Sequence, residues 1–127
     1  MGTQAPHSFK VRTTLAAYRI VAPDTAGSNF CIYPSAATVQ PFGITMDTVK
    51  DTTCAIPVAA AGMIQKLYFN ETMSAGSLVA SDSSGRGVPH VDTTAGSYVI
   101  GRLLGPNIGI TGTIADVLIN PFFKSIP

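Results

Sequence analysis

Few residues in this chain are suited to acid–base or nucleophilic chemistry. His7 and His90 are the only histidines, and His90 lies two residues before Asp92 and near Ser83 and Ser84, so a Ser-His-Asp set can be written down. The Gly-x-Ser-x-Gly elbow that would expose such a serine at a strand-to-helix turn is absent from the sequence. We therefore expect His90 to be an exposed turn histidine and the protein not to be an enzyme.

Metal and cofactor sites have as little support. Cys31 and Cys54 are the only cysteines, and neither they nor the histidines form a Cys-x-x-Cys or His-x3-His pair. The glycine patterns that cradle nucleotide phosphates are also missing. We expect no metal and no cofactor. Both cysteines lie in strand-like runs, which favours buried thiols, although a disulfide between them stays open.

The net charge and the hydropathy pattern limit the classes of partner that the protein could bind. Eight Lys and Arg against seven Asp and Glu give a net charge of +1, too balanced for a protein that binds by neutralising phosphates. We expect no nucleic-acid partner. The apolar stretches are far shorter than a membrane span, and the N-terminus lacks the apolar run of a signal peptide. The sequence predicts a soluble protein made in the cytoplasm, with no membrane partner.

The elements that must position any site are strands. No window of helical length keeps its apolar spacing without Gly or Pro, whereas runs rich in Val, Ile, Thr, Tyr and Phe recur between turn residues. The predicted fold is all-β, a small antiparallel barrel or sandwich with little or no helix, with an N-terminal arm over residues 1–12 and one domain over 13–127. The expected strands are 9–13, 15–21, 29–33, 43–46, 53–58, 62–69, 77–81, 98–104 and 113–119, with a hairpin turn at 82–87.

Two segments of the chain resemble each other in sequence. Residues 41–46 and 99–104 each carry a glycine, Gly43 and Gly101, inside an apolar strand, and each is followed by a loop and another strand, at 54–58 and 114–118. Glycine inside a strand usually marks a bulge, a bend or a close backbone approach. We expect structural roles for both glycines, while a chance similarity in a chain with 12 glycines stays the alternative.

The surface is the most informative property. Charged residues are only 12% of the chain, so Ala, Ser, Thr and Gly must cover much of the exterior. A neutral exterior of this kind is typical of chains whose surface meets other chains, which predicts an oligomer or assembly component. The alternative is a monomer with a neutral Ser/Thr surface.

Residues 36–120 resemble the capsid cement, or head decoration, proteins of tailed bacteriophages. The resemblance rests on 41–46, on the strand-turn-strand segment 75–88, and on the pair 100–104 and 114–119. It implies a homotrimer on the outer surface of the virion capsid, at junctions between capsomers of the major capsid protein, with a mechanical role. The capsid-binding residues expected from it lie in the N-terminal arm and in a C-terminal tail at 121–124, and are Phe9, Lys10, Arg12, Phe122 and Phe123. The alternative is that either end packs on its own domain.

Two other functions stay open. One is a head-fibre or tail-attached β domain, which would share the oligomer but occur in few copies per particle. The other is a small ligand-binding β-barrel or enzyme that uses His90, Asp92 and the 82–87 turn.

Overall fold

The computed structural model describes residues 7–11, 13–25, 29–36, 39–48, 55–91 and 96–124. These ranges contain no helix, which confirms the predicted all-β class. The strands are β1 His7–Phe9, β2 Ile20–Pro23, β3 Cys31–Ile32, β4 Gly43–Thr45, β5 Ile56–Ala59, β6 Ile64–Tyr68, β7 Leu78–Ser81, β8 Gly87–Pro89, β9 Ser97–Gly105 and β10 Ile114–Lys124.

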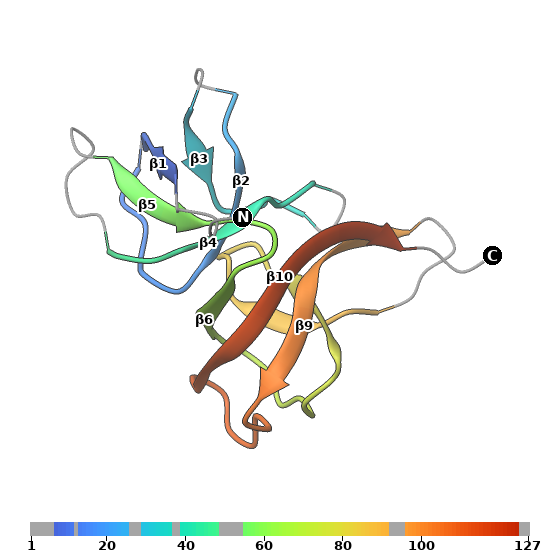
Figure 1. Cartoon of the computed structure of the whole chain (residues 1–127). Helices are drawn as coiled ribbons and strands as arrows, with labels where there is room; N and C mark the ends of the chain where they lie inside the picture. Colours follow the sequence, from blue (N-terminus) through green and yellow to red (C-terminus); the bar gives the residue numbers. More distant parts are fainter. Residues whose placement is uncertain are drawn as a thin grey trace.

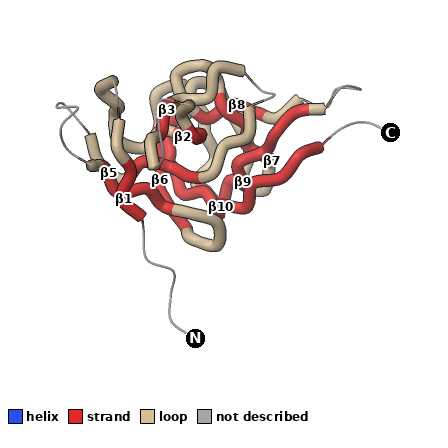
Figure 2. Tube along the Cα trace, turned by 90° about the horizontal axis from the view of Figure 1, so that it is seen from above, coloured by secondary structure: helices blue, strands red, loops and turns tan. Residues whose placement is uncertain are grey.

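The strands form two antiparallel sheets that lie side by side (Figures 1 and 2). The first sheet has the order β1-β5-β4-β2-β3, and the second has the order β6-β10-β9-β7-β8. One isolated parallel bridge joins the two outer strands of each sheet, Lys10 to Phe30 in the first and Phe69 to Gly87 in the second. Each sheet therefore curls toward a small barrel, and the bridge marks its seam.

The two sheets have the same topology, because adding five to each strand number of the first order gives the second. We call residues 7–60 the first half and residues 61–124 the second half. The registers agree as well: Ile20 pairs with Ile44 in β2 and β4, and Leu78 pairs with Arg102 in β7 and β9. The fold therefore consists of two structurally equivalent halves, an internal duplication.

Gly43 and Gly101 occupy equivalent places in this duplication. A Cβ atom at Gly43 would run into the carbonyl oxygen of Ala59 in β5, and one at Gly101 would run into that of Leu118 in β10. Both strands thus approach a neighbouring backbone too closely for any side chain. This close approach explains why both similar segments of the sequence have a glycine at the same position.

The equivalence extends to backbone conformation outside the strands. Tyr18 has φ 61°, and its counterpart Gly76 has φ 90°. The Tyr18 N–H donates to the Thr45 carbonyl at 3.0 Å, and the Gly76 N–H donates to the Leu103 carbonyl at 2.7 Å. The same turn therefore enters the second strand of each half, although only one copy has the glycine that a positive φ favours.

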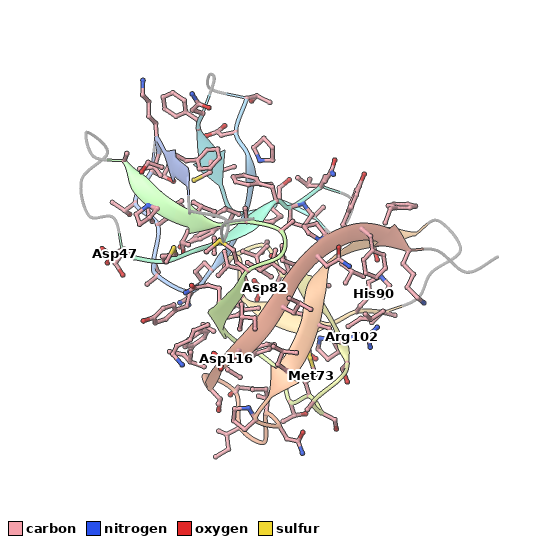
Figure 3. The ribbon with its side chains drawn as sticks, viewed as in Figure 1. Asp47, Met73, Asp82, His90, Arg102 and Asp116 are labelled. Atoms are coloured by element: carbon pink, nitrogen blue, oxygen red, sulfur yellow. The ribbon has the colours of Figure 1, made fainter. Side chains whose placement is uncertain are left out.

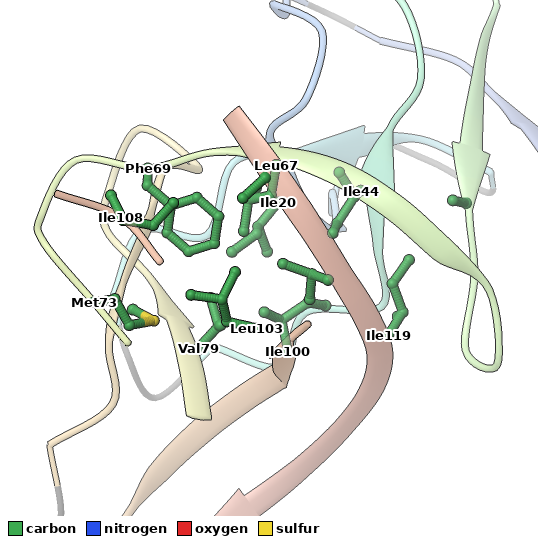
Figure 4. Packing of buried hydrophobic residues seen from close by; sticks show 13 residues of the cluster. Ile20, Ile44, Leu67, Phe69, Met73, Val79, Ile100, Leu103, Ile108 and Ile119 are labelled. Atoms are coloured by element: carbon green, nitrogen blue, oxygen red, sulfur yellow. The ribbon is translucent and has the colours of Figure 1, made fainter. Parts of the chain in front are cut away.

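The hydrophobic core has two parts. The smaller cluster fills the first sheet with residues such as Val21, Cys31 and Val58. The larger fills the second sheet but also takes in Ile20, Ile44 and Ala59 from the first half (Figure 4). These three side chains are fully buried, so the outer face of β2, β4 and β5 is what joins the halves.

Most expected strands occur, with three informative differences. β2 begins at Ile20 rather than at residue 15 because the positive φ of Tyr18 interrupts extended backbone. β8 has no counterpart among the expected strand ranges, because Gly87 and Pro89 disfavour a strand, although the hairpin turn at 82–87 requires one after it. β10 continues to Lys124, so Phe122 and Phe123 lie in the strand and not in a separate tail.

The expected arm also needs a correction. Within residues 1–12, His7–Phe9 forms β1 and pairs with β5, and Val11 is buried in the core of the first sheet. The apolar side chains of Phe9 and Val11 explain this, because they complete the smaller cluster. Residues 1–6 and 12 lie outside the described part of the chain.

Candidate docking surface

The outer face of the second sheet carries the most exposed apolar side chains on regular strands. In β10, Ala115, Val117 and Ile119 point into the core, and the alternate residues Ile114 and Leu118 are exposed. A half-buried strand normally alternates apolar with polar residues. The outer face of β10 instead carries Ile114, Leu118 and Phe122 together with the polar Asp116 and Asn120, which makes it a candidate docking surface.

Neighbouring strands extend this apolar area. Ile64 in β6 pairs with Leu118 and is 60% exposed, and Leu104 in β9 is 46% exposed. The charged residues on the same face are paired: the Lys66 Nζ and Asp116 Oδ1 atoms are 3.5 Å apart, and an Arg102 guanidinium N–H donates to the Gly76 carbonyl at 2.6 Å (Figure 3). Both contacts are solvent-exposed, so they contribute little stability.

A hollow of about 80 Å³ lies on this face, where the pairing of β9 with β10 shifts between Ile119 and Phe122. Its floor is Gly101, and its walls include Leu78, Leu118 and Phe122. The volume is several times the roughly 10–15 Å³ that one water needs. The recess therefore coincides with the strand irregularity and has the size of a side chain.

The far end of the β9–β10 pair presents two aromatic residues on adjacent strands. The rings of Tyr98 and Phe123 meet edge to face with centroids 5.0 Å apart, and Phe123 is 51% exposed. Phe122 lies in the hollow described above. The two phenylalanines expected to bind a partner are thus both accessible, but they take part in different surface features.

The N-terminal residues of the expected site are less available. Phe9 is half-buried, with its ring 4.7 Å from that of Phe42. Lys10 has an exposed side chain, and its backbone forms the seam of the first sheet through the Lys10 N–H to Asn29 carbonyl bond of 2.7 Å. Arg12 lies outside the described residues.

His90 directly follows β8 and is half-buried, rather than exposed as expected. The His90 Nε2 atom is 2.7 Å from the hydroxyl of Ser97, a different serine from those near it in sequence. The Ser84 backbone instead donates to the Asp82 carboxylate, which also accepts from the backbone and side chain of Arg86 and so organises the expected hairpin turn. Asp92 lies outside the described residues.

Cys31 is a free, buried thiol in β3. Its burial, and secondarily the charge of Asp24, raises the thiol pKa from the usual 9.0 to about 11. Such a thiol is protonated at neutral pH and is a poor nucleophile. Cys54 lies outside the described residues.

A second cleft, of about 280 Å³, lies in the first half beside Asp24, Tyr33 and Val39. Asp24 is itself buried and engaged with other groups. Within the described ranges, His, Cys, Asp and Glu form no group of three able to hold a metal ion. Those ranges also contain no helix that could span a lipid bilayer.

Sequence reasoning identified the end of β10 but not the apolar face beside it. Leu118, Ile64 and Leu78 were treated only as strand residues. The signal was available in the β10 sequence, where Ile114 and Leu118 alternate with the apolar Ala115, Val117 and Ile119. Only the register, however, places Ile64 and Leu78 beside them.

Comparisons with known proteins show a similarity in fold. No family model matches the chain, and no curated protein matches it in sequence. Among solved structures, the chain is similar to the N base of the head fibre protein gp8.5 of bacteriophage phi29, with a TM-score of 0.69 and 14% sequence identity. The match covers 90% of this chain and 92% of the other. The two proteins therefore share a fold over nearly their whole lengths.

Proposed function

We propose that this chain is a structural protein of a bacteriophage head. In this proposal it forms a homotrimer and binds the outer surface of the capsid where capsomers of the major capsid protein meet. The observation that carries the proposal is the shared fold with a phage head fibre base over 90% of the chain. The sparse charge and the apolar outer face of the second sheet support an assembly role independently.

The proposed work is mechanical. A protein that binds only the assembled shell stabilises it by mass action, since each bound copy must dissociate before the capsomers can separate. Cys31, the cysteine within the described residues, is buried with a raised thiol pKa, which fits a mechanical role. We propose no cofactor and no catalytic step.

Of the five residues expected to contact the coat, Phe123 fits that role best. It is exposed at the free end of the longest strand pair, and Tyr98 holds its ring in place. Aromatic anchors of this kind often dominate binding energy at interfaces. Phe9 is committed to its own core, and Phe122 belongs to the hollow on the outer face.

The test is binding to purified heads that lack the protein. Phe123→Ala should weaken binding at least about tenfold, the usual cost of removing an interfacial anchor, while Ile110→Ala should leave it unchanged. Ile110 is a suitable control because it is also an exposed apolar residue, at 73%, but lies in the β9–β10 loop. Wild-type protein that fails to bind such heads would contradict the proposal.

A second candidate is a head-fibre base, which is what the phi29 neighbour is. It shares the attachment to the head but would present a fibre to the outside. Copy number separates the two, because a protein at every capsomer junction is far more abundant than a fibre base.

A further inference from the structure

The duplication makes the outer faces of the two halves directly comparable. In the first half, the row Ile20, Ile44 and Ala59 crosses β2, β4 and β5 and is fully buried against the second half. The register gives the equivalent row in the second half as Leu78, Arg102 and Leu118, across β7, β9 and β10. Within one chain, this second row remains uncovered: Arg102 and Leu118 are exposed.

The contact that covers the first row is specific. The segment entering β2 lies at the seam of the second sheet, where the Tyr68 N–H donates to the Tyr18 carbonyl at 2.9 Å and the Ile20 N–H donates to the Gly85 carbonyl at 2.6 Å. The Arg19 guanidinium lies 4.2 Å from the centre of the Tyr68 ring. The first half thus presents its outer row to the seam of the second half.

The second row has the properties of a protein–protein interface that is exposed in the single chain. Leu78 and Leu118 line the hollow, and the charge of Arg102 is directed to the carbonyl of Gly76 in its own chain. The long aliphatic part of the arginine side chain can cover an apolar surface while its head stays hydrogen-bonded. The row therefore offers apolar contact area without an unpaired charge.

We propose that the second row packs against the first half of a second copy of this chain. The contact repeats the interface between the halves. Within a chain, the first row meets the seam of the second half. Between chains, the second row meets the seam of the first half of the next copy. Such a head-to-tail contact is heterologous, and it closes into a ring when the rotation permits. This inference rests on the proposed homotrimer, in which three copies would place six halves around one axis.

The equivalence also predicts the receiving surface. The seam of the first sheet, where Lys10 bridges Phe30, corresponds within one residue to the bridge of Phe69 and Gly87. Lys10 then takes the place of Tyr68, and its side chain is exposed. Because Ile20 is the member of the first row that meets the seam, its counterpart Leu78 lies at the Lys10 region of the next copy, and Phe123 is left for the coat.

The first experiment measures self-association and head binding together. Leu118→Lys should raise the dissociation constant of the trimer at least about 100-fold, because it buries a charge in an apolar contact. Ile110→Lys adds the same charge to an exposed loop and should leave the trimer intact. Sedimentation velocity gives the mass of each variant, and circular dichroism with thermal melting confirms that both remain folded.

The outcomes separate this inference from the proposed function. A monomeric Leu118→Lys beside a trimeric Ile110→Lys supports the interface. A trimeric Leu118→Lys that no longer binds heads would overturn it and assign the face to the coat protein, leaving the head-binding function intact. A trimeric Leu118→Lys that still binds heads would also overturn it.

A cross-linking experiment tests the head-to-tail geometry. In a Cys54→Ser background, the double variant Lys10→Cys, Leu78→Cys treated with a short bis-maleimide should give covalent species up to the trimer. Each single variant should remain largely monomeric on a denaturing gel, because like residues do not meet in a heterologous contact. Dimers formed by Leu78→Cys alone would show a two-fold contact instead and overturn the proposal.

Discussion

At the scale of single residues, positions that are equivalent in the two halves of the fold carry different residues. Tyr18 adopts a positive φ that its counterpart Gly76 adopts without cost, and an ordinary residue in that conformation is strained by roughly 1 kcal/mol or more. The first half tolerates this strain because Tyr18 donates to Thr45 and accepts from Tyr68, which fixes the approach of the two halves.

Cys31 links burial to pH dependence. Because its pKa is about 11 in the folded protein and 9.0 ordinarily, the unfolded chain loses the thiol proton first as pH rises. The free energy of unfolding should therefore fall between pH 9 and 11, by on the order of 2 kcal/mol from this residue. Below pH 9 the thiol is protonated in both states and adds no pH dependence.

The measurement is urea unfolding at a series of pH values for the wild type and Cys31→Ala. Subtracting the two curves removes the titration of Tyr and Lys, which both proteins share. The wild type should lose more stability than the variant above pH 9. Parallel curves would show that the thiol does not resist ionisation.

At the scale of elements, the β4–β5 and β9–β10 pairs depend on their glycines. Gly43→Ala and Gly101→Ala should each lower the free energy of unfolding by at least about 2 kcal/mol, since the added methyl meets a backbone carbonyl that cannot rotate away. Gly109→Ala is the control, because a Cβ there has no neighbour within 4 Å.

Denaturant unfolding of the three variants gives the comparison. Gly109→Ala should stay within about 0.5 kcal/mol of the wild type. Equal stability for all three variants would mean that the close strand approach is not a constraint on the fold.

The sequence predicted these elements unevenly, for physical reasons. Alternation and turn residues predicted the strand class, the 82–87 hairpin and the correspondence of Gly43 with Gly101. The sequence similarity aligns residues 54–58 with 114–118, which is one residue out of register. In the structure, Val58 corresponds to Val117 rather than to Leu118. Sheet pairing is a long-range property, and strand patterns alone do not specify the register of that pairing.

The candidate surface was harder to predict than the strands. Phe123 was identified because an exposed aromatic residue is costly and therefore conspicuous. The row of Leu78, Arg102 and Leu118 comes from three separated strands, and no local pattern joins them. For Phe9 the sequence left an arm and packing on its own domain both open, because its partner Phe42 lies far along the chain.

At the scale of the whole molecule, the duplication divides the chain into two halves that share one core. Ile44 and Arg102 are equivalent in register, yet Ile44 is buried between the halves and Arg102 is exposed. Ile44→Ala should cost about 2–5 kcal/mol of unfolding free energy. Arg102→Ala, which loses one exposed hydrogen bond, should cost less than about 1 kcal/mol.

Both variants should unfold in a single transition, because the larger hydrophobic cluster spans the halves. The curves are best recorded in dilute protein, where self-association adds least to stability. Two separate transitions, with only one shifted by Ile44→Ala, would show that the halves fold independently.

The central claim is that this chain is a structural component of a phage head. The most direct measurement is its copy number in gradient-purified particles, by quantitative peptide mass spectrometry against the major capsid protein. A homotrimer at every capsomer junction predicts a ratio of about one copy per coat subunit, and a few copies would favour the fibre base. Absence of the chain from purified particles would contradict the account.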